Sequence, residues 1–498
     1  MDRPIDAAGK ENEQKMGTER PSGADSQTAH APGSHGAGPG PAADITATAE
    51  GRAEHAMDEL RASRSGWVWM ALTASLALPW LLFRTLVDFH HSPPALVALL
   101  TGVAILSAAF ILSWAAEVFQ LDVSQALALA LLSLIAVLPE YAVDVVFAWR
   151  AAADPTQAPY AVANMTGANR LLIGVGWSSV VLVAWWRARR RRSGAPDAAV
   201  VTSDGGGTSV TLERSQALEL GALALATLYS FFIPLKGGIG LLDAVVLGSL
   251  FAVYAWGTAR APAEHPELVG PAATVATLAP AARRVATVVM FLFAAFVIFA
   301  SAEPFAEGLV NSGASLGVDE FLLVQWVAPF ASESPEFLVA LLFAWRGMAQ
   351  AGLRTLVASK VNQWTLLIGS LGVAYSIALG AAQDLPLDAR QTEELFLTSA
   401  QSLFALALIA NFDLSVRESL FLLGTFLLQL VFPGQEVRLA MAVAYMVMVV
   451  YLLASSRSRR DTLLQIPSMI RETITRPPVV PVEAGDGRTD AKKAGTAV

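Results

Sequence analysis

The feature that most constrains this chain is a series of long apolar runs between Trp67 and Ser455. Each run is about as long as the roughly 20 residues that an α-helix needs to cross a bilayer. We expect about twelve spans, near residues 67–87, 94–117, 125–150, 160–186, 216–235, 239–257, 283–303, 318–346, 352–378, 394–411, 415–432 and 435–455. The pattern predicts an all-α polytopic membrane protein.

The composition excludes several classes of protein. Charged residues make up 15% of the chain, against roughly 25% in a soluble domain, so a cytosolic multidomain enzyme is excluded. The absence of cysteine excludes disulfides, zinc–thiolate sites, Fe–S clusters and cysteine nucleophiles. All six histidines lie in tails or loops, so zinc hydrolysis and Ser/His triads lack their parts. A carboxylate-only intramembrane enzyme and a channel are the weaker alternatives of other classes, and we expect no enzyme activity.

The chain divides into four predicted segments. Residues 1–66 are rich in Gly, Ala, Pro, Ser and charge and are predicted to be a disordered tail without a cleavable signal. Residues 67–260 and 261–456 are the two predicted transmembrane halves, and residues 457–498 are a polar C-terminal tail.

Arginine clusters predict the orientation of the spans. They comprise Arg61 and Arg64; Arg187 and Arg189 to Arg192; Arg260, Arg283 and Arg284; and Arg457, Arg459 and Arg460. With twelve spans and the N-terminus inside, all four clusters fall on the cytoplasmic side, as the positive-inside rule requires. We therefore expect a multi-pass protein of the cell membrane with both termini in the cytoplasm.

The chain contains an internal repeat. Residues 138–150 read LPEYAVDVVFAWR and residues 334–346 read SPEFLVALLFAWR, and Leu-Leu-Ile-Gly recurs downstream at 171–174 and 366–369. These Pro-Glu segments lie in the third and eighth predicted spans, an odd number apart, so they cross the membrane in opposite directions. Inverted-topology repeats of this kind are typical of secondary transporters, which bind their substrate near the midplane on broken helices.

Glu140 and Glu336 are the leading candidates for a site, because each lies inside an apolar run. A carboxylate at mid-bilayer costs at least roughly 2.5–3.5 kcal/mol, so a cation, a proton or a partner must compensate it. Pro139 and Pro335 precede the two acids and free backbone carbonyls one turn back. Carboxylate and carbonyl oxygens together predict a cation site. A buried Glu bonded to a neighbouring helix is the alternative, but the matching repeat positions favour function.

Further polar residues accompany the two acids. Asp144 stands one turn after Glu140 on the same helix face. Oxygen ligands of this kind suit Na⁺ or Ca²⁺, although for any single Asn or Ser an interhelical hydrogen bond is an equally good interpretation. The predicted cation ligands are Glu140, Glu336, Asn164, Glu333, Ser332, Asp144, Asn169 and Asn362.

Lys360 is the only lysine that lies within a predicted span. One interpretation is that it extends its ammonium toward the cytoplasm. The other is that it pairs with Glu336, Glu333 or Glu140, occupies the place of a cation, and couples cation binding to proton release.

The two Pro-Glu segments, each followed by a polar helix, resemble the cation/calcium exchanger superfamily, the sodium/calcium exchanger-like membrane proteins. The resemblance covers roughly residues 94–432 and implies two inverted repeats of about five helices, with an extra helix at each end. By position, Glu140 and Glu336 match the cation-ligating acids of that family and Asn164 matches its polar ligand. Gly167-Ala168-Asn169 stands where the family has Gly-Ser-Asn.

The chain departs from this family pattern at three places. Ala136 and Val137 replace hydroxyl residues before Glu140, Ser332 and Glu333 stand before Glu336, and Lys360 lies at or beside a position that holds Asn or Asp. Fewer hydroxyls and an added ammonium favour Na⁺/H⁺ or another cation/proton exchange over a site for Ca²⁺, which takes 6–8 oxygens.

The expected function is that of a secondary active cation antiporter. It exchanges Na⁺ or Ca²⁺ for protons by alternating access at a midplane carboxylate site, and a Na⁺/Ca²⁺ exchanger proper is the alternative. No cofactor is expected, and the partners are small inorganic cations and the lipid bilayer, with no nucleic acid. The sequence leaves the ion, the stoichiometry, the oligomeric state and the role of the tails open.

Overall fold

A computed structural model describes residues 65–87, 91–122, 138–190, 200–202, 208–260, 268 and 270–475. Residues 1–64 of the predicted disordered tail lie outside this part of the chain, as do Ala136, Val137 and residues 476–498.

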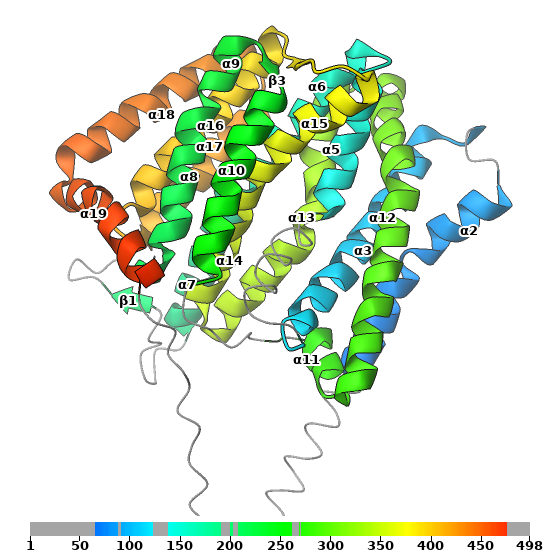
Figure 1. Cartoon of the computed structure of the whole chain (residues 1–498), viewed down its shortest axis with the longest axis horizontal. Helices are drawn as coiled ribbons and strands as arrows, with labels where there is room; N and C mark the ends of the chain where they lie inside the picture. The colour runs from blue at the N-terminus through cyan, green and yellow to red at the C-terminus, as the bar shows by residue number, and fades with distance from the viewer. Residues whose placement is uncertain are drawn as a thin grey trace, which may run out of the picture. The chain divides into compact units, whose positions relative to one another are not determined.

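The first half of the described chain is a succession of helices (Figure 1). A helical segment begins at Ser65 and ends at Leu86. Its second part is α2 (Leu78–Leu86), followed by α3 (Pro94–Phe119), α5 (Leu138–Ala151), η2 (Pro155–Gln157), α6 (Ala158–Leu171), the π-helical η3 (Leu172–Trp177), α7 (Ser178–Arg190), η4 (Arg214–Gln216), α8 (Ala217–Ser230), α9 (Phe232–Lys236) and α10 (Leu241–Thr258).

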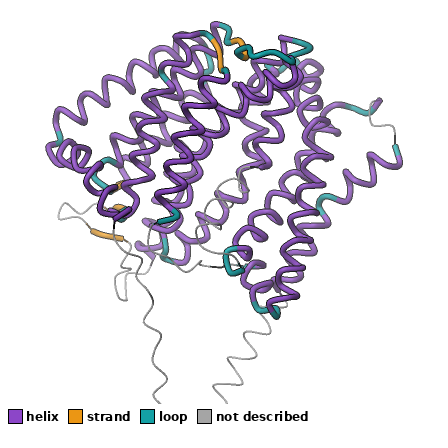
Figure 2. Tube along the Cα trace, in the orientation of Figure 1, coloured by secondary structure: helices purple, strands orange, loops and turns teal. Residues whose placement is uncertain are grey.

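The second half continues in the same way (Figure 2). It contains α11 (Pro271–Ala276), α12 (Pro280–Leu316), α13 (Glu320–Arg346), α14 (Ala349–Asn362), the π-helical η5 (Gln363–Leu367), α15 (Ile368–Leu379), α16 (Ala389–Ile409), α17 (Val416–Val431), α18 (Gln435–Ser455) and α19 (Arg457–Thr475). Asp388 and Ser415 accept backbone hydrogen bonds in capping boxes at the starts of α16 and α17.

Seven helices in the described part are long and apolar enough to cross a membrane, and a bent α13 raises the number to eight. The bend in α13 is 55° and separates Glu320–Ser334 from Glu336–Arg346, as expected for a helix interrupted by a proline. The described part of α5 and the whole of α17 are only 14 and 16 residues long, so the count of about twelve spans stays a prediction.

We call the two ends of this helix bundle upper and lower, as they stand in Figure 1. The upper end carries the loops at 151–157, 317–319 and 380–388, and an ion pair of 2.7 Å joins Arg390 to Asp319 there. At the lower end, Arg283 donates to Asp122 at 2.8 Å. α5 and α12 therefore run toward the upper end, whereas α3 and α13 run away from it.

Close helix crossings place α13 at the centre of the repeats. α13 packs against both α6 and α14. A Cβ at Gly167 of α6 would lie 1.8 Å from the carbonyl oxygen of Gln325, and one at Gly352 of α14 would lie 2.5 Å from that of Ala340. Only glycine allows the two polar helices to approach α13 this closely.

The apolar core has two parts. Buried side chains of α2, α3, α11 and α12 form one cluster, in which α12 lies along α3. The other cluster joins α5–α10 with α13–α19. The core of the second cluster therefore surrounds both Pro-Glu helices.

Short antiparallel strands tie loops together at both ends. At the lower end, β2 (Thr208–Thr211) pairs with β1 (Val200–Thr202) and with β5 (Asp413–Ser415), and Val210 stands opposite Leu414. At the upper end, β3 (Gly238–Ile239) pairs with β4 (Leu385–Pro386).

The predicted polar C-terminal tail begins with a helix. α19 occupies residues 457–475, and its Ile466 and Met469 are buried, with Ile466 and Ile470 close to Gly221 of α8. These apolar residues recur at helical spacing, which explains why this part of the tail packs on the bundle.

Candidate cation site between the two repeats

Four acidic side chains and one lysine from the two repeats lie together inside the bundle. α5 supplies Glu140 and Asp144, α13 supplies Glu333 and Glu336, and α14 supplies Lys360. Glu140, Asp144, Glu333 and Lys360 are at most 2% exposed, and Glu336 is partly buried. Glu140 lies within electrostatic range of all four other groups. The structure thus brings Glu140 and Glu336, which are 196 residues apart in the sequence, into one cluster.

In the first repeat, α6 holds one acid and leaves the other without a partner. Asn164 Nδ2 donates to Asp144 Oδ1 at 2.8 Å. Asp144 Oδ2, Asn164 Oδ1 and both carboxylate oxygens of Glu140 are buried without a hydrogen bond from any described residue. Buried acceptors of this kind are rare in folded proteins, because a proton, a water molecule or a cation normally satisfies them.

In the second repeat, α14 and η5 hold both acids. Ser359 Oγ donates to Glu336 Oε2 at 2.5 Å, and Gln363 Nε2 donates to Glu333 Oε1 at 3.0 Å. Glu333 Oε2 and Gln363 Oε1 have no partner within the described ranges. Ser359 and Gln363 were not among the predicted ligands, although they lie one helical turn apart and on either side of Lys360.

Lys360 does not extend toward the cytoplasm, because its side chain is fully buried. Its ammonium donates to Asn169 Oδ1 at 2.5 Å and lies 4.0 Å from the centre of the Trp364 ring, a cation–π contact. The predicted direct ion pair with Glu336, Glu333 or Glu140 does not form in the described part of the chain. Lys360 instead acts on Glu333 and Glu140 at longer electrostatic range.

The remaining predicted ligands are engaged in other contacts. Ser332 Oγ donates to the Ala328 carbonyl one turn back at 3.2 Å. Asn362 Oδ1 accepts from the Tyr141 hydroxyl at 3.4 Å. The Asn169 side-chain oxygen is the one that accepts from Lys360, and its Nδ2 donates to the Met165 carbonyl at 2.7 Å.

The cluster is rich in oxygen but is not gathered around one point. Across the described residues, no three acidic or histidine side chains stand close enough to hold a metal ion together. Six buried oxygens from the two repeats nevertheless lack a partner there: two of Glu140 and one each of Asp144, Asn164, Glu333 and Gln363.

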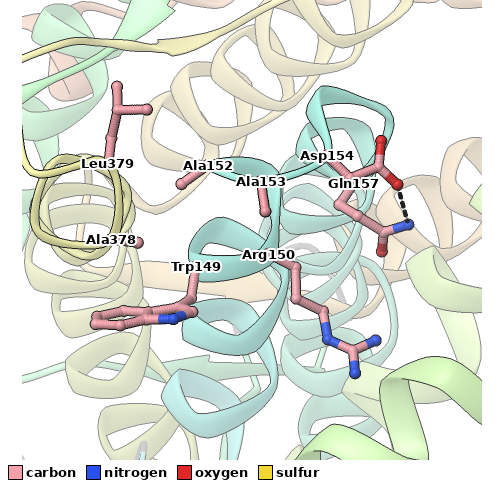
Figure 3. Close-up of a pocket in the computed structure, with 8 residues that line it drawn as sticks. All are labelled: Trp149, Arg150, Ala152, Ala153, Asp154, Gln157, Ala378 and Leu379. Carbon is pink, nitrogen blue, oxygen red and sulfur yellow. Dashed lines mark hydrogen bonds between the residues drawn. The ribbon is translucent and has the colours of Figure 1, made fainter.

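Two cavities lie along α5 on the upper side of the cluster. The first, of about 510 Å³, opens between the end of α5 and α15, where Gln157 donates to Asp154 at 3.5 Å (Figure 3). The second, of about 470 Å³, shares Trp149 with the first and includes Tyr141 and apolar residues of α10 and α15. Tyr141 connects this second cavity to Asn362.

A second buried charge cluster lies beside the first and was missed from the sequence. Arg170, which follows Asn169, forms an ion pair of 2.6 Å with Glu394 of α16, and both side chains are 2% exposed. Arg438 of α18 lies 3.7 Å from the other carboxylate oxygen of Glu394. Arg438 also forms an ion pair of 2.9 Å with Glu393, so the two arginines and two glutamates neutralise one another, unlike the charges of the first cluster.

The family model for the sodium/calcium exchanger protein matches residues 94–259 and 286–434. The chain belongs to the sodium/calcium exchanger family. This confirms the predicted superfamily and the all-α polytopic membrane class. The exchanger is a cation antiporter and not an enzyme, and the cations that it moves across the bilayer are cargo rather than cofactors.

Solved structures of other exchangers resemble this one. The chain is 42% identical to the H⁺/Ca²⁺ exchanger CAX, with a TM-score of 0.75, over 83% of this chain and 99% of that chain. It is 16% identical to the Ca²⁺/H⁺ antiporter YfkE (TM-score 0.49; 77% and 99% covered) and 16% identical to the sodium-calcium exchanger NCX_Mj (TM-score 0.45; 68% and 98% covered). A comparison with curated proteins found no match.

Proposed function

We propose that this exchanger moves Ca²⁺ in one direction and protons in the other, by alternating access at the carboxylate cluster. The observation that carries the proposal is the joining of unpartnered carboxylate oxygens from both inverted repeats at one buried place. The 42% identity to a protein named as an H⁺/Ca²⁺ exchanger supports this choice of ions.

The charge balance of the cluster supports an exchange of Ca²⁺ for protons. Four ionised carboxylates and one ammonium have a formal charge of −3. An unneutralised charge of this size is strongly disfavoured in a low-dielectric interior. Bound protons remove this charge and a divalent cation lowers it to −1, and occupancy by one makes the other unfavourable. Mutually exclusive occupancy is the condition for obligatory exchange.

In this proposal Glu140 and Glu336 are the central ligands of the cation. Asp144, Glu333 and Asn164 add oxygens that have no other partner in the described structure. Ser332, Asn169 and Asn362 become ligands only after their present contacts rearrange, and Asn169 must first release Lys360.

Lys360 has the role of a coupling group in the proposal. Lys360 directly follows Ser359, which donates a hydrogen bond to Glu336. Its ammonium also lies within electrostatic range of Glu140 and Glu333. A fixed positive charge there competes with an arriving cation, so cation binding favours displacement of the ammonium or loss of its proton.

We further propose that the lower end, which carries the arginine clusters of α7, α12 and α19, faces the cytoplasm of a cell membrane. Both termini then lie in the cytoplasm, about twelve helices cross the bilayer, and residues 67–260 and 261–456 form the two halves.

Purified exchanger in liposomes with a trapped pH dye tests this proposal. When Ca²⁺ is added outside, the lumen is expected to become alkaline as protons leave in exchange for Ca²⁺, and an imposed Na⁺ gradient is expected to leave Ca²⁺ flux unchanged. Glu140→Gln and Glu336→Gln are expected to abolish the signal, whereas Asp461→Asn on the exposed face of α19 is the control. Ca²⁺ flux driven by Na⁺ without proton movement would instead establish a Na⁺/Ca²⁺ exchanger, and flux without a counter-ion would establish a channel.

A further inference from the structure

Two helices, one from each half of the chain, end side by side at the lower end of the bundle. α7 ends at Arg190, α13 ends at Arg346, and the two helices pack against each other. The rings of Trp186 and Trp345 lie 5.0 Å apart across this contact. We call Trp186, Trp345, Arg189, Arg190 and Arg346 the lower arginine–tryptophan patch.

Tryptophan rings hold the arginines of α7 in place without using their hydrogen-bond donors. The guanidinium of Arg190 lies 3.6 Å from the centre of the Trp186 ring, and that of Arg189 lies 4.1 Å from the centre of the Trp185 ring. A guanidinium is planar and its five N–H donors lie in that plane, so stacking on a ring leaves the donors available. Their geometry matches two oxygens of a phosphate group. The patch therefore presents fixed donors to an anion.

The arginines of the patch have no acidic partner in the part of the chain that the structure describes. Arg189, Arg190 and Arg346 are exposed, and none of them forms an ion pair there. The sequence contains no aspartate or glutamate between residues 178 and 196 or between residues 337 and 383. Because like charges repel one another, an anion from outside the chain would stabilise the patch.

The same Phe-Ala-Trp-Arg sequence near the end of α5 has different surroundings. Arg150 there pairs with Glu303 at 2.8 Å and with Glu307 at 2.5 Å, and its side chain is 24% exposed. At the upper end, the protein itself thus supplies the anions that neutralise this arginine. At the lower end, the corresponding Arg346 depends on an anion from the surroundings, which for a membrane protein are the bilayer and the solution.

The patch lies at the depth of the lipid headgroups. Arg346 follows Glu336 by ten residues, which is a rise of about 15 Å along α13. This distance is half of the roughly 30 Å hydrocarbon layer, so a glutamate near the midplane places Arg346 at the membrane surface. Trp345 beside it is 54% exposed, and tryptophan is enriched at this interface. The position of the patch therefore favours a lipid as the source of the anion.

We propose that the lower arginine–tryptophan patch binds the phosphate of an anionic phospholipid, with an acyl chain of that lipid against the exposed ring of Trp345. Basic surfaces between transmembrane helices are suited to such headgroups. The bound lipid neutralises the arginines of α7 and α13 together and so holds the ends of the two helices against each other. The proposal does not depend on which ions the exchanger moves, because its test measures lipid binding and stability.

Native mass spectrometry of the full-length exchanger, titrated in detergent with phosphatidylglycerol or phosphatidylcholine, measures the binding. The parent protein is expected to bind phosphatidylglycerol in preference. In the variant Arg190→Gln with Arg346→Gln, the affinity for phosphatidylglycerol is expected to fall roughly thirtyfold, because each arginine near an anionic lipid contributes about a factor of five. Equal affinity of the parent for the two lipids would overturn the proposal.

A matched variant separates the patch from the general positive charge of the lower end. Arg214→Gln with Arg457→Gln removes the same charge from two exposed arginines, which lie on η4 and α19. This variant is expected to bind phosphatidylglycerol as the parent does. An equal loss of affinity in both double variants would assign the binding to overall charge and refute the patch.

Thermal unfolding of the parent protein keeps the proposal testable if the patch variant folds poorly. Phosphatidylglycerol is expected to raise the melting temperature in detergent more than phosphatidylcholine does. Inorganic phosphate at the same concentration is expected to leave the melting temperature unchanged, because it lacks the acyl chain that contacts the tryptophan. An equal rise with inorganic phosphate would contradict a lipid as the ligand, and an equal rise with both lipids would contradict recognition of the anionic headgroup.

Discussion

The two Pro-Glu helices have nearly the same sequence but different surroundings. In the first repeat, Glu140 has no hydrogen-bond partner in the described structure. In the second, Ser359 donates to Glu336, and Lys360 adds a buried positive charge. The inverted repeat therefore duplicates a backbone rather than a binding site, and each copy contributes a different part of the chemistry.

The ends of the two helices differ in the same way. Both end in Phe-Ala-Trp-Arg, but Arg150 at the upper end is held by Glu303 at 2.8 Å and by Glu307 at 2.5 Å. Arg346 at the lower end makes no ion pair with a described residue. The same four residues thus lie at opposite ends of the bundle, and only at the upper end does their arginine pair with acids.

The largest expected effect comes from removing either shared glutamate. Glu140→Gln and Glu336→Gln are each expected to reduce Ca²⁺-driven proton flux by about a hundredfold or more. Removing one partner of a buried charge pair costs about 3–5 kcal/mol, and 1.4 kcal/mol is a factor of ten. The measurement is the initial rate in proteoliposomes. If only one of the two variants loses activity, the repeats do not share a cation.

A smaller effect is expected where the polar helices cross α13. Gly167→Ala places a Cβ 1.8 Å from a backbone oxygen and Gly352→Ala places one at 2.5 Å, so both lower the melting temperature in detergent, the first more than the second. Overpacking costs about 1–3 kcal/mol or more. Gly248→Ala, which meets nothing within 4 Å, is the matched control. Equal melting temperatures for all three variants would contradict the close crossings.

Lys360 gives the second repeat a charge that the first repeat lacks, because the matching position in the first repeat holds Met165. Lys360→Met removes the competing ammonium, so Ca²⁺ affinity measured by titration calorimetry is expected to rise about tenfold, a change of roughly 1.4 kcal/mol. Lys360→Arg is the control that keeps the charge. A weaker affinity in Lys360→Met would assign the lysine a supporting role for the cation site instead.

The smallest expected effect concerns two aspartates in the loops. Arg283 and Arg284 donate to Asp122 and lower its pKa to about 2, whereas at Asp154 a hydrogen bond from Thr156 lowers the pKa. A lowered pKa stabilises the fold above the ordinary value near 4, and this contribution is lost as the pH falls toward 2. Asp122→Asn is expected to lower stability at pH 7 by less than about 1 kcal/mol, and the difference should vanish near pH 2 in thermal unfolding. A difference that persists at pH 2 would contradict this account.

Features repeated along the chain were predictable, and contacts between distant segments were not. The Pro-Glu repeat identified Glu140 and Glu336, and hydropathy located the helices around them. The pairing of Arg170 with Glu394 joins residues 224 positions apart, and nothing local to either residue marks it. The same holds for Lys360: the sequence shows that its charge needs a partner, but the inverted packing makes that partner Asn169 rather than a glutamate.

The structure also identifies two hydrogen-bond partners of the acids that the sequence did not single out. Ser359 and Gln363 bind Glu336 and Glu333 because α14 crosses α13 at Gly352, which brings a whole polar face against the Pro-Glu helix. The sequence shows that Ser359 and Gln363 are four residues apart and therefore share one helix face. It does not show that this face packs against α13.

Anomalous diffraction from crystals grown with Sr²⁺ in place of Ca²⁺ would show whether one cation binds to both repeats at once. We expect a peak with coordinating oxygens from both Glu140 and Glu336. A peak bound by only one of the two Pro-Glu helices, or none among these acids, would contradict it.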